Sequence, residues 1–339
     1  MRRTALALAA ASLLALAGCT ASQESESTQE GELVIYSGRS EELIAPLIEQ
    51  FETSSGTDVS VRYGDSAELA AQILEEGQQT PADVFFAQDA GALQVLQDEE
   101  LTTGLPTDTV EQVPAQYRSA EDQWVGTSGR ARVIVYNTDA VNPDQVPDSV
   151  QELTAQQWRG KVGIAPTNAS FQSFVTALRK TQGEEAAQQW LADLEANDVQ
   201  TFENNSAILD AVDAGQVELG LVNHYYLYEK ADEVGEANLS AANGAFAAGD
   251  PGNLVNVAGV AVTPTGSANR VSEEFVDFLL SPQAQDYFAT QTSEYPLTDA
   301  AEPRAELPPL ATIEGPELTL DQLADLRGTQ DMLMQVGLL

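Results

Sequence analysis

Short runs of β-branched residues alternate with helical patterns along the first part of the chain, and this alternation constrains the fold most. The runs LVIYS at 33–37, DVSVRY at 58–63 and ADVFFA at 82–87 are typical of strands. Between them, segments 41–56 and 66–77 have a helical pattern, and the second ends in a glycine stop. Strands that alternate with helices predict parallel sheets in an α/β architecture.

The chain is long enough for two lobes. It has 339 residues and 43% hydrophobic content, which is ample for two sizeable cores. Two later strand patterns, RARVIVYN at 130–137 and NVAGVAVT at 256–263, flank a middle block with its own α/β alternation. This order indicates that the chain forms part of lobe one, crosses to form lobe two, and then returns to complete lobe one. Lobe one is predicted to comprise 32–130 and 257–302, and lobe two 131–256 and 303–339.

The N-terminus has the features of a secretory signal. Two arginines precede the apolar run ALALAAASLLALA, which is too short to span a membrane as a helix. The small residues before Cys19 resemble a bacterial lipobox, which implies cleavage after Gly18 and diacylglycerol on the Cys19 sulfur. Residues 1–18 would be the signal peptide, and the polar, acidic segment 19–31 a flexible tether.

Cys19 is the only cysteine of the chain, so no internal disulfide is possible. The alternative to lipidation is a buried free thiol. We expect the lipidated form, which makes the protein extracytoplasmic and anchored to the cell membrane.

The chain is strongly acidic, with 15 basic and 53 acidic residues and a net charge of −38. A surface of this sign makes nucleic acid an unsuitable partner. The acidity fits either a saline habitat or the attraction of cations to the surface. It gives weak support for a cationic ligand.

The segment LVNHYYLYE at 221–229 holds three of the nine tyrosines and the only histidine. Packing in a core or on a half-buried strand is one interpretation. Adjacent side chains of a strand point to opposite faces, so Tyr225 and Tyr226 could share a ligand only if the backbone turns there. VELGLV is predicted to form a buried strand, with Asn223 as the N-cap of a following helix. Both tyrosines would then lie about 100° apart in the first turn of a helix and could point into a cleft.

The chain resembles the ferric-iron-binding proteins of bacterial ABC importers, a branch of the extracellular solute-binding proteins. The resemblance rests on LVIYSGR, TPADVFF, GRARVIVYN and SEYPLT, and above all on the paired tyrosines after LVNH. It implies a two-lobed, type II periplasmic-binding-protein fold with a ligand cleft between the lobes. It also implies a monomer without enzymatic activity, which captures Fe(III) and delivers it to ABC permease subunits.

The resemblance assigns the metal ligands to Tyr136, Tyr225 and Tyr226. Fe(III) favours hard anionic oxygen, and three phenolates would balance its charge. A phenol with a pKa near 10 does not ionise alone at neutral pH, but a bound cation stabilises the deprotonated form. Tyr228 matches no ligand of the family and is interpreted as packing or cleft rim. His224 is interpreted as a hydrogen-bonded scaffold residue.

Lobe one departs from the best-known pattern of the family. Ser40 and Gln88 occupy positions where some members have histidine and glutamate, and neither is a good charged ligand. This favours a site completed by a small synergistic anion such as carbonate. Arg39 and Arg130 could hold a planar dianion, although each could instead form a salt bridge.

A helix start predicted in PTNASFQSF offers a second place for an anion. The resemblance to phosphate-using members implies that Asn168, Ser170 and Asn205 bind it, while a plain N-cap is the alternative. A receptor for a small organic anion, such as a phosphonate or carboxylate, is the rival function, but it would not need three phenols. No Ser-His-Asp order, HExxH motif or P-loop supports an enzyme.

Overall fold

Two long antiparallel strands connect the two halves of the sheet in this computed structural model, which describes residues 32–339. The hydrogen-bonded order is β2-β1-β3-β9-β4-β7-β5-β6, with β8 and β10 also paired to β4. The strands are β1 (Leu33–Ser37), β2 (Val59–Tyr63), β3 (Val84–Ala87), β4 (Val125–Asn137), β5 (Val162–Ile164), β6 (Gln200–Thr201), β7 (Leu219–Asn223), β8 (Ala241–Gly244), β9 (Val255–Val262) and β10 (Tyr295–Pro296). The predicted signal peptide, Cys19 and the tether lie outside the described residues.

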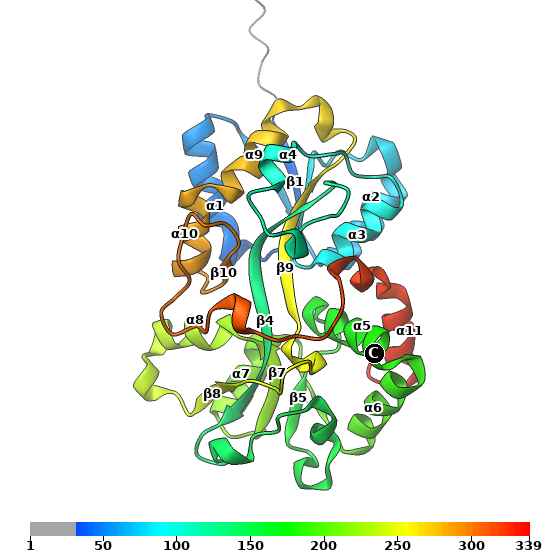
Figure 1. The fold of residues 1–339 in the computed structure, drawn as a ribbon, viewed down its shortest axis with the longest axis vertical. Helices are drawn as coiled ribbons and strands as arrows, with labels where there is room; N and C mark the ends of the chain where they lie inside the picture. The colour runs from blue at the N-terminus through cyan, green and yellow to red at the C-terminus, as the bar shows by residue number, and fades with distance from the viewer. Residues whose placement is uncertain (1–31) are drawn as a thin grey trace, which may run out of the picture. The chain divides into compact units, whose positions relative to one another are not determined.

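The strand directions confirm the α/β prediction in each half and add a feature that the sequence pattern did not indicate. β1 runs parallel to β2 and β3, and β5 runs parallel to β6 and β7. β4 and β9 are antiparallel to their neighbours and run side by side between the two groups of elements (Figure 1). The first part of β4 pairs with β9, and its second part pairs with β7 and β8.

Helices cover both halves of the sheet. They are α1 (Glu41–Ser55), α2 (Ser66–Glu76), α3 (Ala90–Asp98), α4 (Thr107–Val110), α5 (Ala169–Gln182), α6 (Glu184–Ala196), α7 (Asn205–Asp213), α8 (Tyr225–Val234), α9 (Arg270–Leu280), α10 (Pro282–Thr290) and α11 (Leu326–Gln335). Gly56 ends α1 with φ of 74°, in the left-handed region that glycine adopts without strain. Within residues 32–339, no helix combines the length and apolar character needed to cross a membrane.

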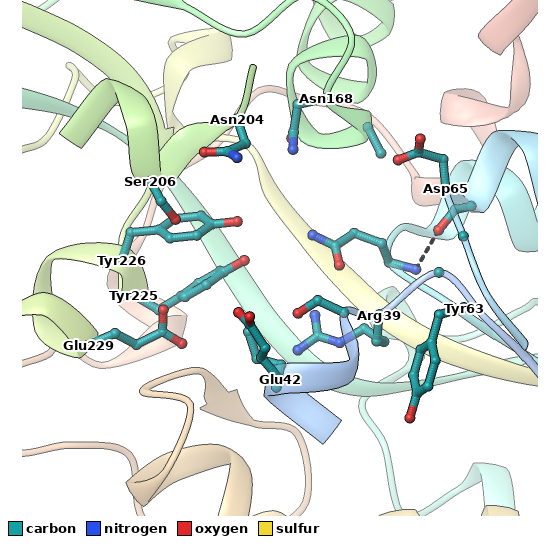
Figure 2. A pocket seen from close by; sticks show the side chains of 17 residues that line it. Arg39, Glu42, Tyr63, Asp65, Asn168, Asn204, Ser206, Tyr225, Tyr226 and Glu229 are labelled. Atoms are coloured by element: carbon teal, nitrogen blue, oxygen red, sulfur yellow. Dashed lines mark hydrogen bonds between the residues drawn. The ribbon is translucent and has the colours of Figure 1, made fainter. Parts of the chain in front are cut away.

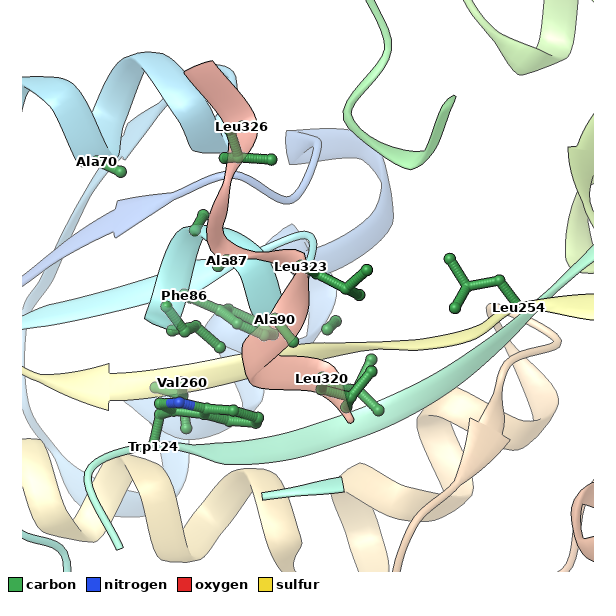
Figure 3. Close-up of a cluster of buried hydrophobic side chains, with 14 of the residues drawn as sticks. Ala70, Phe86, Ala87, Ala90, Trp124, Leu254, Val260, Leu320, Leu323 and Leu326 are labelled. Atoms are coloured by element: carbon green, nitrogen blue, oxygen red, sulfur yellow. The ribbon is translucent and has the colours of Figure 1, made fainter. Parts of the chain in front are cut away.

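The C-terminal segment contacts both halves. The 3-10 turn Leu320–Ala324 packs against α3, and Leu320 and Leu323 join the buried cluster around Phe86 and Trp124 (Figure 3). α11 packs against α5, where the Thr176 and Thr329 hydroxyls form a hydrogen bond of 2.7 Å. The residue boundaries given above for the two lobes remain a prediction.

Candidate functional site

A cavity of about 520 Å³ lies where the C-terminal ends of β1, β2 and β3 meet the N-terminal ends of α5, α7 and α8. Lobe one contributes Arg39, Ser40 and Gln88, which follow β1 and β3. Lobe two contributes Asn168, Asn204, Ser206, Tyr225, Tyr226 and Glu229 (Figure 2). Strand ends and helix N-termini are the predicted surroundings of the ligand.

The tyrosine pair begins α8 directly after β7. β7 ends at Asn223, and His224 is the N-cap with helical backbone angles, so the prediction of Asn223 as N-cap is wrong by one residue. The turn brings the rings of Tyr225 and Tyr226 together, with centroids 4.3 Å apart and an interplanar angle of 28°. Both side chains line the cavity, as the helix-turn argument predicted (Figure 2).

The hydroxyl groups of the two tyrosines have no hydrogen-bond partner within the described chain. Tyr225 is 1% exposed, yet neither its hydroxyl nor that of Tyr226 forms a hydrogen bond with any residue in 32–339. Burial raises the pKa of Tyr225 well above its ordinary value, and Tyr226 raises it further, while Arg130 and Arg39 oppose the shift. Tyr225 is therefore neutral on its own at physiological pH, and a bound cation would be needed to ionise it.

Tyr136 lies away from the pair, which contradicts its predicted role as a third ligand. It sits near the end of β4 opposite Leu219, packs in the hydrophobic core and does not line the cavity. β4 changes its pairing partner from β9 to β7 closer to its N-terminal end. Arg130 pairs with β9, and Arg132 pairs with β7. Tyr136 is four residues further, about 13 Å along an extended strand.

His224 has the predicted scaffold role. Its Nδ1 accepts a hydrogen bond from the Ala131 N–H at 3.2 Å, so its Nε2 donates to the Ser293 carbonyl at 3.0 Å. Burial lowers its pKa to about 4, which keeps the ring neutral at physiological pH. Both nitrogens are thus engaged away from the cavity. Tyr228 also packs as predicted, with its ring 5.4 Å from the Arg304 guanidinium.

Arg39 forms a buried ion pair, which was the alternative to the predicted anion clamp. Its Nη1 and Nη2 donate to the two carboxylate oxygens of Glu294 at 3.0 and 2.7 Å. The side chains of both residues are at most 1% exposed, and Ser128 and Thr292 also donate to Glu294. The fork formed by Nη1 and Nη2 is therefore occupied, which confirms the salt-bridge alternative for Arg39, while its Nε has no hydrogen-bond partner within residues 32–339.

Two further arginines lie buried with few partners. The Nε of Arg130 is 3.9 Å from Glu294, and none of its nitrogens donates a hydrogen bond within residues 32–339. Arg132, which was not singled out from sequence, donates from Nη1 to the Ser170 hydroxyl at 3.0 Å and leaves Nε and Nη2 unpartnered. Burial lowers the pKa of Arg132 to about 9. Negative charge near these guanidinium groups would be stabilised.

The three residues predicted to bind an anion at the helix start are brought together. The Asn168 Oδ1 accepts hydrogen bonds from the Ser170 N–H and hydroxyl, at 3.0 and 2.6 Å, and from the Asn205 Nδ2 at 3.3 Å. Asn168 is thus the N-cap of α5 and also lines the cavity, whereas Ser170 and Asn205 are buried behind it. The N-termini of α5 and α7 both reach the cavity, where free N–H groups favour an anion.

Sequence reasoning missed a carboxylate beside the tyrosines. Glu229 lies one helical turn after Tyr225 on α8 and lines the same cavity (Figure 2). Burial raises its pKa to about 8, with repulsion from Glu294 adding to the shift and Arg39 opposing it. The spacing of four residues from Tyr225 was the available signal, because residues i and i+4 share a helix face.

Comparison with known proteins identifies the family. The model of the bacterial extracellular solute-binding proteins matches residues 79–313, well over half of the chain. The chain belongs to this family. Among other members, it is similar to the Fe(3+)-binding periplasmic protein of Serratia marcescens, with 30% identity over 98% of this chain and 97% of that protein. This solute-binding protein is also 31% identical to the major ferric iron-binding protein of Neisseria meningitidis serogroup B, over 91% of its own length and 93% of the relative.

Solved structures agree with the two-lobed fold of the solute-binding proteins. Iron-bound HitA from Pseudomonas aeruginosa matches with a TM-score of 0.86 and 31% identity, over 91% of this chain and 99% of that one.

Proposed function

We propose that this solute-binding protein captures Fe(III) in the cavity described above and delivers it to the permease of an ABC importer. The observation that carries the proposal is the pair of adjacent phenols, Tyr225 and Tyr226, which line a cavity without hydrogen-bond partners among residues 32–339. Phenolate is a hard anionic oxygen ligand, which Fe(III) prefers. The names of the relatives from Serratia and Neisseria support the same ligand.

A small oxyanion such as carbonate would complete the site. The N-termini of α5 and α7 supply N–H groups on the side of the cavity next to Tyr226, and Arg132 supplies positive charge behind Ser170. Arg130 stands near Glu294 with its nitrogens free of hydrogen bonds in the described chain. It would stabilise the phenolates electrostatically and does not line the cavity.

Delivery requires a location at the membrane. The lipobox-like residues before Cys19 support a lipid anchor. The acidic segment 19–31 would act as a spacer between the membrane and the folded part. We propose a monomeric lipoprotein on the outer side of the cell membrane. Cys19→Ser should release the protein into the soluble fraction or block processing, and unchanged membrane association of this variant would contradict the anchor.

A receptor for a small organic anion is the second candidate, favoured by the two helix N-termini at the cavity. One visible absorption spectrum distinguishes the two candidate functions. If iron binds, adding Fe(III) to the purified protein should produce a visible phenolate-to-iron charge-transfer band. A colourless protein that instead binds a phosphonate or carboxylate in a calorimeter would support the organic-anion receptor.

A further inference from the structure

Two phenols leave Fe(III) with too few protein ligands. The ion usually takes six ligands, while Ser40 and Gln88 offer only uncharged side chains to the cavity and Tyr136 lies elsewhere. Other oxygen-bearing side chains of lobe one, those of Glu42, Tyr63 and Asp65, line the cavity from the elements that face the pair (Figure 2). Two phenolates also leave one positive charge unbalanced. A further anionic oxygen close to the pair would address both deficits.

Glu229 lies where such an oxygen is needed. It is four residues after Tyr225 on α8, so the two side chains lie on the same helix face. Figure 2 shows its carboxylate beside the ring of Tyr225, directed toward the cavity. Glu42, from the first turn of α1, faces it from lobe one.

No positively charged side chain pairs with Glu229 in the part of the chain that the structure describes. Glu229 is half-buried and forms no hydrogen bond or ion pair with any residue in 32–339. Nearby cations pair elsewhere: Lys230 with Asp210 and Asp213, Arg39 with Glu294, and Arg304 with Asp232 and Glu306. An ionised carboxylate that is half-buried and lacks a partner is unfavourable, and a cation in the cavity would remove this cost.

We propose that Glu229 is a direct ligand of the bound ferric ion, so that one helix provides three anionic oxygens in the pattern Tyr225-Tyr226-x-x-Glu229. The inference rests on the proposed iron site. Two phenolates and one carboxylate carry charge −3, which equals the charge of the ion. The synergistic anion then fills remaining coordination positions and is not needed for neutrality.

The test compares Glu229→Gln with Glu233→Gln, a control one turn further along the same helix. The Glu233 side chain lines a smaller adjoining cavity and not the one that contains Arg39 and Tyr225. Affinity for Fe(III) is measured by competition with citrate, and the visible band is recorded for each protein. Glu229→Gln should bind about ten-fold or more weakly while keeping a phenolate band. Glu233→Gln should bind like the wild type. Matching thermal melts of the iron-free proteins establish that each variant folds.

Chemical rescue separates direct ligation from a general charge effect. Glu229→Ala should lose affinity, and added formate should restore much of it by occupying the vacated position. Wild-type affinity in Glu229→Gln, or a loss in Glu229→Ala that formate does not rescue, would overturn the inference while the wild-type band still supported iron binding. A wild type without any band would instead overturn the proposed iron site.

Discussion

The rings of Tyr225 and Tyr226 stack in the first turn of α8, with centroids 4.3 Å apart, so their phenols enter the cavity side by side. This contact makes ionisation of the two groups interdependent, because Tyr226 raises the pKa of Tyr225 in addition to the effect of burial. Only a cation held between the phenols and neighbouring oxygens removes that penalty. Iron binding and proton release are therefore linked.

Acidification should weaken iron binding. The pKa of Tyr225 is raised, so the proton is held firmly at neutral pH and must leave when the ion binds. The affinity should rise with pH and fall as the medium becomes acidic, by about ten-fold per pH unit for each proton released. Competition with citrate between pH 6 and 8, corrected for the protonation of citrate, measures this slope. An affinity that does not change with pH would be inconsistent with phenolate ligands.

Arg39→Gln should lower the stability of the folded protein. We do not expect a specific loss of anion binding. The substitution leaves Glu294 buried without its two-pronged donor, and breaking a buried pair in this way costs about 3–5 kcal/mol. Urea unfolding of the iron-free protein measures the loss. The double variant Arg39→Gln/Glu294→Gln should recover part of it, since no unpaired carboxylate remains. A stability equal to that of the wild type in the single variant would refute this role.

His224 should make stability depend on pH. Its pKa is about 4 in the folded protein, whereas the unfolded chain takes up the proton near 6.5. The unfolded state therefore binds more protons between these values, and the free energy of unfolding falls as pH drops through this window. The loss attributable to His224 is about 2 kcal/mol at pH 5. In His224→Asn this component should disappear, so denaturant unfolding at pH 7.5 and 5 should show a smaller difference than in the wild type.

Bicarbonate should strengthen iron binding, and more so when Glu229 is removed. In the wild type the anion fills open coordination positions at the N-termini of α5 and α7, whereas in Glu229→Gln it must also balance charge. Arg132→Gln should reduce the effect, because Arg132 supports this region through Ser170. Fe(III) titrations of carbonate-depleted protein, with and without bicarbonate, compare the three proteins. An affinity that bicarbonate does not change in any of them would argue that water fills the open positions.

The architecture was largely predictable from local patterns. Alternating strand and helix signals gave the parallel arrangement around β1 and β5, and the argument from adjacent side chains predicted that Tyr225 begins a helix. These conclusions depend on periodicity within a few residues, which a sequence displays directly. The antiparallel pairing of β4 with β9 joins residues more than a hundred positions apart, and local periodicity carries no information about it.

The candidate site was predictable only in part for the same reason. Arg39 pairs with Glu294, 255 residues later, so its commitment to a salt bridge could not be inferred from the residues around it. Tyr136 lies near the end of a strand, but its distance from the cavity depends on where the pairing of β4 changes from β9 to β7. Glu229 differs, because its spacing from Tyr225 was visible and only its lack of a partner required the structure.

The most direct test of the tyrosine site is an Fe(III) titration of Tyr225→Phe/Tyr226→Phe, followed by visible absorbance and by metal analysis after dialysis. Each change removes one phenol oxygen and keeps the ring, so the stacked pair should still pack and the protein should still fold. Tyr228→Phe is the matched control, since this tyrosine packs near Arg304 and does not line the cavity. We predict that the double variant shows no charge-transfer band and retains no iron, while Tyr228→Phe behaves as the wild type. Stoichiometric iron retained by the double variant would contradict the account.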